Sequence, residues 1–406
     1  MPEKRSIPVA RPWMDSREAD AARRPIEKGW VTQGPEVAAF EREFAAFVGA
    51  PHACAVSNCT TALHLALLAC GVSAGDEVVT VSHSFVATAS CVVHCGAVPV
   101  FVDIQPDTFN IDPAEIEKAI SPRTKAILCV HQMGMPCDLR AILDMANRRG
   151  LPVVEDAACA IGSEIRWGSE WQKIGKPHGD IACFSFHPRK LLTTGDGGML
   201  TTANAEFDAQ FRLLRQHGMS VPDSVRHGAN RVIFEEYLGV GFNYRMTDIQ
   251  AAVGREQLKK LPEMVATRRK LASRYCQILK DIPGLSFPEE PEWARSNWQS
   301  FCVRLPETWG QVEVMQHMLD SGVATRRGIM CAHREPAYVD VPWRCAESAG
   351  TNDSCKCPPK SCRQLAQSET AQDRCIILPL FHDLSEEDQD YVAETLGQFA
   401  AKLQAR

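Results

Sequence analysis

A single lysine stands between a predicted aromatic strand and a glycine-rich turn in the segment FSFHPRKLLTTGDGGML, residues 184–200. Ser185 and His187 alternate with phenylalanines, so one face of this strand carries polar groups. The glycines all follow Lys190, whereas a phosphate-binding P-loop needs glycines before its lysine. Among apolar side chains the pKa of Lys190 would be lowered, which favours the neutral, nucleophilic amine. The alternative is an ordinary lysine that reaches solvent from a loop.

The glycine-rich turn after Lys190 has a role of its own in this interpretation. Without side chains at these positions, the backbone can pass close to a bulky planar group. The turn is therefore predicted to make room beside a ring-shaped ligand.

A buried carboxylate is predicted at the end of another strand. Asp156 follows a mostly apolar run in the segment LPVVEDAACAIGS. A carboxylate there is costly unless a cation or hydrogen-bond donors meet it. At the carboxyl end of a parallel strand, its partner could be the protonated nitrogen of a heterocyclic ligand. The alternative is an aspartate that only caps the following turn.

Two predicted helix starts offer donors to an anion. In SNCTTALHLALLACG, Ser57, Thr60 and Thr61 precede an amphipathic helix, whose first N–H groups and positive dipole end attract anions. In GFNYRMTDIQAA, Asn243 and Arg245 lie on a loop just before a second helix. For both segments, simple helix capping remains the alternative.

Together, the four segments match the needs of one cofactor. Pyridoxal phosphate requires a lysine amine for its Schiff base, an acidic partner for its ring nitrogen and donors for its phosphate. The combination of segments therefore predicts a pyridoxal phosphate site.

The order of the predicted elements explains how such distant segments can meet. Through about the first 260 residues, β-branched runs alternate with amphipathic helical segments. Short connections between them predict an α/β fold with a largely parallel sheet covered by helices on both sides. Side chains at the carboxyl ends of such strands gather at one edge. The predicted strands span residues 77–83, 98–104, 125–131, 151–157, 181–187 and 197–202.

The pattern changes near residue 261, so two domains are expected. Residues 1–260 would form a large cofactor-binding domain with an N-terminal arm. Residues 261–406 would form a smaller C-terminal α+β domain, with a long charged helix, a short strand and two further helices. This second region contains a cysteine-rich loop near residues 343–363.

Charge and hydropathy exclude several classes of partner. The formal net charge is −6, which gives no reason to expect nucleic acid or an anionic membrane as partner. The N-terminus is charged and has no apolar core, so we expect no signal peptide, and no apolar run is long enough for a membrane span. We therefore expect a cytoplasmic protein.

Seventeen cysteines are present, an odd number that cannot pair completely. In the cytoplasm they would stay reduced. Four of them, Cys345, Cys355, Cys357 and Cys362, lie in the cysteine-rich loop, and a zinc site is one interpretation. Their spacing, C-x9-C-x-C-x4-C, contains no paired C-x2-C knuckles, so we expect no metal and favour a plain loop insertion. A disulfide is the third alternative.

The chain resembles the DegT/StrS family of sugar aminotransferases, which have the fold-type I architecture of aspartate aminotransferases. The resemblance covers about residues 29–396 and implies a mixed, mostly parallel seven-stranded sheet between helices, with a smaller C-terminal α+β domain. It is carried by GWVTQGPEVAAFEREFAAFVGA, SNCTTALHLAL, GDEVVTVSHSFVATA, GAVPVFVDI, VVEDAACAIGS, CFSFHPRKLLTTGDGGM, GFNYRMTDIQAA and IILPLFHDLSEEDQDYV.

The resemblance implies roles for the residues around the cofactor ring. Lys190 would form the Schiff base with pyridoxal 5'-phosphate and move the reacting proton. Asp156 would keep the pyridine nitrogen protonated, and Phe85 would stack on the ring. Cys159 stands where the family usually has glutamine or histidine, so the ring contact expected there is weakened.

The resemblance also implies how the phosphate is held. Backbone and hydroxyl donors of Cys59 and Thr60 would bind it, with the hydroxyl of Ser185. Asn243 of the partner subunit would complete the set, which implies a homodimer with shared active sites.

The implied activity is transfer of an amino group from glutamate, with pyridoxamine 5'-phosphate as the amine-carrying form, to a keto group of a nucleotide-linked sugar. His187 and His333 are candidates for substrate contacts, and a structural, hydrogen-bonded role is the alternative for both. Another hypothesis is an aminotransferase for a non-nucleotide ketone, such as a cyclitol or a keto-sugar acid. A sugar dehydratase of the family would carry histidine in place of Lys190. A catalytically silent regulator would not need Lys190 and Asp156 together.

Overall fold

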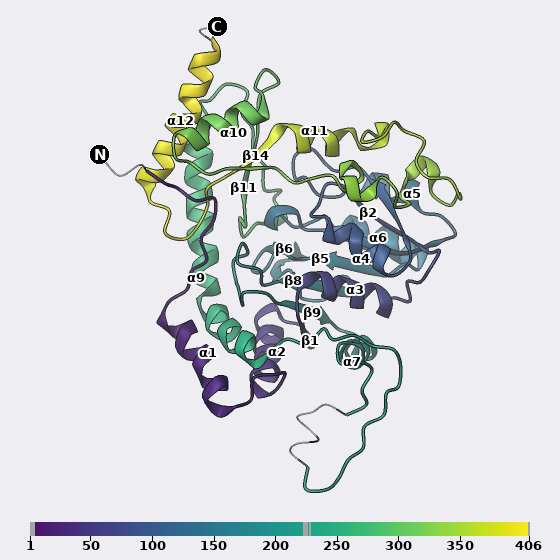
Figure 1. The fold of residues 1–406 in the computed structure, drawn as a ribbon. Coiled ribbons are helices and arrows are strands. Elements are labelled where there is room, and N and C mark those ends of the chain that lie inside the picture. Colours follow the sequence, from purple (N-terminus) through teal and green to yellow (C-terminus); the bar gives the residue numbers. More distant parts are fainter. Residues whose placement is uncertain (1–4, 222–225, 227–228, 405–406) are drawn as a thin grey trace.

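The computed structural model describes residues 5–221, 226 and 229–404. Its centre is an eight-stranded sheet in the order β1-β9-β8-β5-β4-β2-β3-β13 (Figure 1). Every neighbouring pair is parallel except those of β9, which runs antiparallel to β1 and β8. The strands are β1 (His52–Val56), β2 (Glu77–Val81), β3 (Val98–Val102), β4 (Thr124–Val130), β5 (Val153–Asp156), β8 (Ile181–Ser185), β9 (Gly198–Thr202) and β13 (Arg344–Cys345).

Helices cover both faces of this sheet. Alternate residues of each strand point to opposite faces, and along β1 Ala53 and Ala55 join one buried cluster while Cys54 and Val56 join another. The first face is covered by α2 (Pro35–Val48), α5 (Pro113–Ala119), α6 (Leu139–Arg149) and the start of α9 (Asp248–Leu279). The second face is covered by α3 (Cys59–Ala69), α4 (Ala87–His94) and α7 (Ala205–Leu214).

The expected α/β architecture is confirmed, with one correction to the strand count. All six predicted strands are present, and each observed end lies within two residues of the predicted one. The sheet has eight strands rather than seven, because β13 from the cysteine-rich segment adds to the edge of β3. A two-residue strand has too little alternation to be recognised in a sequence.

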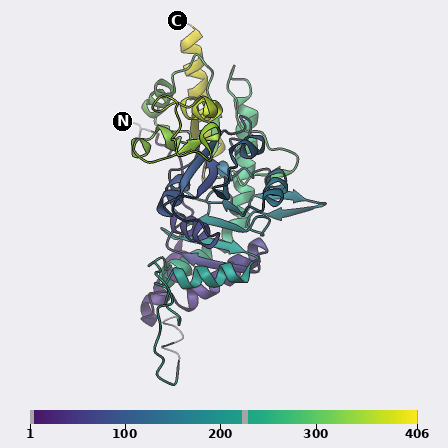
Figure 2. The same cartoon turned by 90° about the vertical axis from the view of Figure 1, so that its right-hand side faces the viewer.

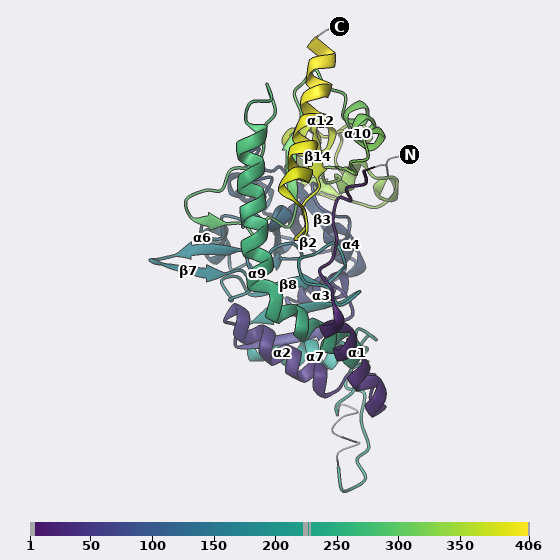
Figure 3. The same cartoon turned by 90° about the vertical axis from the view of Figure 1, so that its left-hand side faces the viewer.

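Further strands lie outside the main sheet. β6 (Glu164–Trp167) and β7 (Glu170–Lys173) form a hairpin that projects from the body (Figure 3), and β10 (Ala294–Arg295) pairs with β6. A second three-stranded sheet has the order β11-β14-β12, with antiparallel pairs. Its strands are β11 (Phe301–Arg304), β12 (Arg326–Arg327) and β14 (Cys375–Leu378).

The C-terminal part of the chain has its own buried cluster. That cluster joins the second half of α9 to β11, β14, α10 (Gln311–Asp320) and α12 (Glu386–Gln404), while α11 (Ala366–Arg374) leads into β14. Helix α9 runs through residue 260, where the two domains were expected to divide, and connects both clusters (Figure 3). The division into two domains therefore stays a prediction. No helix in the described part of the chain is long and apolar enough to cross a membrane.

The N-terminal helix α1 (Ser16–Lys28) is attached to α9 through buried charges. The Lys260 amine donates hydrogen bonds to Glu18 Oε2 at 2.8 Å and to Asp15 Oδ2 at 2.9 Å. Gln257 Nε2 donates to Glu18 Oε1 at 2.8 Å. Burial raises the pKa of Glu18, but Lys260, the Asp15 N–H and Gln257 outweigh it and the pKa is lowered.

We expect Lys260→Ala to lower the free energy of unfolding by about 3 kcal/mol, because it leaves the buried Glu18 carboxylate without its cation. Lys259→Ala is the matched control, since Lys259 is exposed and pairs with Glu256 of its own helix. Because the pKa of Glu18 is lowered in the folded chain, its contribution is present at neutral pH and lost as the pH falls below about 4.5. Urea unfolding at two pH values measures both effects, and equal losses for the two variants would contradict the assignment.

Candidate active site

A cavity of about 530 Å³ opens at the carboxyl ends of β5 and β8, between the main sheet and the β11-β14-β12 sheet. Side chains from both sheets and from the start of α3 line it. Of the possible anion donors that have no further predicted role, Thr61 lines the cavity, whereas Ser57 and Arg245 do not. Of the residues with a predicted role at the cofactor or the substrate, all except Asn243 and His333 lie on its wall: Cys59, Thr60, Phe85, Asp156, Cys159, Ser185, His187 and Lys190.

Asp156 ends β5 and is buried, with donors on both carboxylate oxygens. The hydroxyl of Thr88, in the first turn of α4, donates to Oδ2 at 2.8 Å, and the backbone N–H of Ala158 donates to Oδ1 at 3.1 Å. Burial raises the pKa of Asp156, and these two donors lower it only in part. One oxygen thus caps the following turn, so the structural alternative is present, while the side chain still lines the cavity.

Lys190 lies in the connection between β8 and β9, close to Cys159. Its Nζ donates a hydrogen bond to Cys159 Sγ at 3.0 Å. Burial lowers the pKa of Lys190, but Cys159 and Asp156 outweigh burial and the pKa is raised. The lowered pKa expected from the sequence is therefore wrong for this state of the site, because polar neighbours from other strands face the amine. The same contact gives Cys159 a partner that its place in the sequence did not indicate.

The start of α3 lies on the cavity wall. Asn58 caps the helix through its side chain, which accepts from the Thr61 N–H at 2.9 Å. Cys59 and Thr60 are the first two helical residues, and N–H groups at these positions have no acceptor within a helix. Helix capping by Ser57 or Thr60 is therefore wrong, since Asn58 is the cap. Cys59 and Thr60 line the cavity and are available to an anion.

One glycine of the turn after Lys190 is required by the fold itself. A Cβ on Gly198 would lie 2.5 Å from the backbone carbonyl of Asn58. Glycine at this position thus lets β9 pass against the start of α3, and the expected room for a ring-shaped ligand beside the turn stays a prediction.

Phe85, Ser185 and His187 occupy the remaining predicted positions on the wall. Phe85 is 55% exposed, which is unusual for an aromatic side chain that lines a cavity. The Ser185 hydroxyl accepts a long hydrogen bond of 3.4 Å from the His187 N–H. Burial and the nearby Arg189 lower the pKa of His187, and its Nδ1 accepts from the Arg189 N–H at 3.2 Å. Neutral His187 therefore carries its proton on Nε2.

His333 and Asn243, which have predicted roles at the substrate and the phosphate, do not line the cavity. His333 is buried between Ser82, whose hydroxyl is 2.7 Å from Nδ1, and Glu369, whose Oε1 is 3.1 Å from Nε2. The structure therefore gives His333 the hydrogen-bonded, structural arrangement. Asn243 is exposed, next to the loop that precedes α9.

Several residues of the site were missed in the sequence. Thr88 lies behind the cavity wall and orients Asp156, and its hydroxyl lies 2.8 Å from that of Ser84, which lines the cavity. Gln132 follows the end of β4 and lines the cavity as well. Polar residues directly after buried parallel strands are the signal that could have found Ser84 and Gln132. No local pattern links Thr88 to a carboxylate 68 residues away.

The whole chain matches known proteins. The model of the DegT/DnrJ/EryC1/StrS aminotransferase family matches residues 12–397. The chain belongs to this family. A curated relative, the spore coat polysaccharide biosynthesis protein SpsC of Bacillus subtilis (strain 168), is 37% identical over 402 residues, which are 98% of each chain.

Two solved structures have the same fold as this chain. DesV of S. venezuelae, solved in complex with a ketimine intermediate, is 31% identical with a TM-score of 0.84, covering 98% of this chain and 99% of that one. The putative sugar aminotransferase Spr1654 of Streptococcus pneumoniae, in its PLP form, is 26% identical with a TM-score of 0.85 and the same coverage. The chain is therefore an aminotransferase.

For this DegT/DnrJ/EryC1/StrS aminotransferase we expect Thr88→Val to reduce activity about tenfold, because a hydrogen bond to a charged group contributes about 1.5–3 kcal/mol. Loss of the donor raises the pKa of Asp156 further, so the acid limb of the pH–activity profile should move to higher pH. Thr88→Ser, which keeps the hydroxyl, is the control. An unchanged acid limb in Thr88→Val would show that Thr88 has no influence on Asp156.

Proposed function

We propose that this aminotransferase moves an amino group from glutamate to a keto group of a nucleotide-linked sugar. The observation that carries the proposal is that the Lys190 amine and the buried Asp156 carboxylate line one cavity at the ends of neighbouring strands. An amine for proton transfer and a carboxylate for a ring nitrogen are the two groups that pyridoxal phosphate chemistry needs from a protein.

The residues on the wall fit pyridoxal phosphate. Asp156 would hold the pyridinium nitrogen, since a carboxyl with a raised pKa becomes a stable carboxylate when a cation faces it. The α3 N-terminus with Thr60, together with Ser185, would hold the phosphate. Phe85 would cover one face of the ring. When bound, the cofactor carries the amino group and withdraws electrons from the reacting carbon.

The protein's own part in the chemistry is to position groups and move a proton. Lys190 would take the proton from the substrate carbon and return it, and the Cys159 sulfur orients the amine that does so. His187 Nε2–H would donate to a substrate oxygen, because its Nδ1 is already used as an acceptor. Side chains from β12 and β14 close the other side of the cavity, where they limit the access of water.

Two arginines favour anionic substrates. Arg189 and Arg326 are exposed and line the cavity, and neither forms an ion pair with an acidic side chain in the described residues. Guanidinium groups bind carboxylates and phosphates in a bidentate manner. They would suit the carboxylates of glutamate and the diphosphate of a nucleotide-linked sugar. A non-nucleotide ketone lacks the second anion, which makes it the less favoured acceptor.

We also propose that the active enzyme is a dimer. Asn243 is exposed in the single chain, in accord with a role in the site of a second subunit. Residues 229–241, which precede Asn243, project away from the body of the molecule (Figures 1 and 2) and expose large apolar side chains. Groups of exposed apolar side chains on a protein surface often mark interaction sites. The most exposed of these side chains are Val232 (81%), Phe234 (87%) and Val240 (91%).

The half-reaction with glutamate tests the donor and the role of Lys190. The chain loaded with pyridoxal phosphate should release 2-oxoglutarate from glutamate alone, with a change in the cofactor absorbance. Lys190→Arg keeps the charge but cannot act as the base, so the rate should fall by about 10³ or more. Lys176→Arg, outside the cavity, should not change it. Undiminished activity of Lys190→Arg, or release of a different keto acid only, would contradict the proposal.

The acceptor is tested in the same assay with the glutamate-treated enzyme. A nucleotide-linked keto-sugar should be aminated with a lower KM than the same keto-sugar without its nucleotide. Arg326→Ala should raise KM for the nucleotide-linked acceptor only. Equal KM values for both acceptors would favour the cyclitol or keto-sugar acid alternative.

Shared active sites predict that two inactive variants can restore each other. Lys190→Ala and Asn243→Asp, which places a carboxylate against the phosphate, should each be inactive alone. A random mixture of subunits should regain about a quarter of the wild-type activity, because half the dimers then contain one intact site of two. Lys190→Ala mixed with Asp156→Ala is the control and should regain nothing. Absence of recovery in the first mixture would place Asn243 in the site of its own chain.

A further inference from the structure

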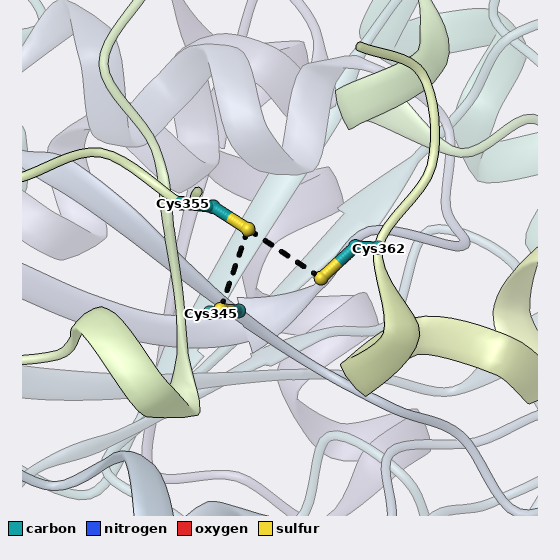
Figure 4. A group of neighbouring side chains, drawn as sticks. All are labelled: Cys345, Cys355 and Cys362. Carbon is teal, nitrogen blue, oxygen red and sulfur yellow. Dashed lines mark hydrogen bonds between the residues drawn. The ribbon is translucent and has the colours of Figure 1, made fainter. Parts of the chain in front are cut away.

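The cysteine-rich loop brings together side chains that are spread over 18 residues of sequence. Cys345 is the last residue of β13, Cys355 and Cys357 lie on the loop that follows, and Cys362 precedes the short 3-10 helix η5 (Arg363–Leu365). Figure 4 shows three of the four sulfurs, those of Cys345, Cys355 and Cys362, pointing toward one another. None of the four cysteines lines the active-site cavity.

The distances between these sulfurs suit a shared metal ion. Cys355 Sγ lies 3.5 Å from Cys345 Sγ and 3.6 Å from Cys362 Sγ, and all three sulfurs lie within 4.8 Å of one another. A zinc ion with four sulfur ligands at about 2.3 Å holds neighbouring sulfurs about 3.8 Å apart. The three sulfurs are thus already near the edge length of such a tetrahedron.

Each of the three sulfurs accepts a hydrogen bond from the backbone N–H of the residue two positions further along the chain. The donors are Glu347 for Cys345, Cys357 for Cys355 and Gln364 for Cys362. Donors of this kind stabilise thiolates and orient metal ligands.

Cys357 is the fourth cysteine of the loop, and its sulfur is not among the three that lie within 4.8 Å of one another. It packs with Cys355 against the apolar cluster that contains Cys345 and Cys362, so its side chain would have to turn toward them to act as the fourth ligand. That cluster also contains Phe101 of β3, so the sulfurs lie against the edge of the main sheet.

Hydrogen bonds to the body of the molecule hold the start of the loop, where the Gly350 N–H donates to Glu77 and Arg123 donates to Asn352, but few side chains of the loop are buried. From residue 349 to 361, all of them described, no side chain is buried, and between 350 and 361 only Cys355 and Cys357 are even half-buried. A turn from Pro358 to Ser361, with Lys360 at φ 63°, returns the chain so that Cys362 faces Cys355. Ordering so many exposed residues costs conformational entropy, which packing of small thiols offsets only weakly.

We propose that Cys345, Cys355, Cys357 and Cys362 bind one zinc ion as a structural tetrathiolate site. Zn²⁺ binds to four sulfurs as thiolates, so each coordinating thiol releases its proton to solvent, and no electron is transferred. Thiolate sulfur is the ligand that zinc prefers in closed structural sites. The ion fastens the loop to β13 and hence to the edge of the main sheet at β3. A disulfide would instead need an oxidant, and it would leave two of the four cysteines without a role.

Metal content of the untagged full-length chain, purified under reducing conditions without chelator, tests the proposal. We expect about one zinc per chain, and less than about a tenth of that in Cys355→Ser and Cys357→Ser. Cys276→Ser, a half-buried cysteine on α9 outside the cluster, should keep its zinc. Wild-type chain with no more zinc than Cys355→Ser would overturn the site.

Two further measurements keep the test decisive if a variant fails to fold. Cobalt(II) added to the reduced, metal-free wild-type chain should give the strong thiolate-to-metal charge-transfer bands of a tetrahedral sulfur site. The chain should also take up zinc in competition with a chromogenic chelator, with four thiols protected from alkylation. No charge-transfer bands, no zinc uptake, or a disulfide among the four cysteines in metal-free protein would each reject the proposal.

Discussion

The Asp156 carboxylate is buried at the end of a strand, and the arrangement of the active site depends on how that charge is stabilised. A charge in such a position is tolerated only if donors or a cation compensate for lost water. Hydrogen bonds from Thr88 and from the Ala158 N–H provide part of this compensation, yet the pKa of Asp156 remains raised. The site therefore favours a positively charged partner at this point, and the ring nitrogen of pyridoxal phosphate would be such a partner.

The same constraint explains why the main sheet matters for the chemistry. β5 and β8 are parallel neighbours, with Asp156 paired to Cys183, so both strands end at the same edge. The chain then leaves β8, passes Lys190 and returns as the antiparallel β9. Because Gly198 has no side chain, β9 can pass against the start of α3. The carboxylate and the α3 N-terminus are thereby held by regular elements of the fold, and the amine lies on the connection that joins β8 to β9.

Much of this could be predicted from residue types. The alternation of apolar strands and amphipathic helices predicted the α/β sheet, and Lys190, Asp156 and Thr60 were found because each follows or begins a recognisable element. The antiparallel direction of β9 and the two-residue strand β13 could not be predicted, since neither leaves a periodic pattern. The pKa of Lys190 was predicted with the wrong sign, because Cys159 is 31 residues distant in sequence and its contact depends on the fold.

The sequence by itself determined the class of fold, the cofactor chemistry and the residues that end each strand, because periodicity and residue type are local properties. Only the tertiary structure decided which of these residues meet. It brings Thr88 to Asp156 and Cys159 to Lys190, and it places His333 between Ser82 and Glu369, away from the cavity. It also turns four irregularly spaced cysteines into a cluster, since pairing of β13 with β3 and the turn at Lys360 set distances that spacing along a chain does not encode.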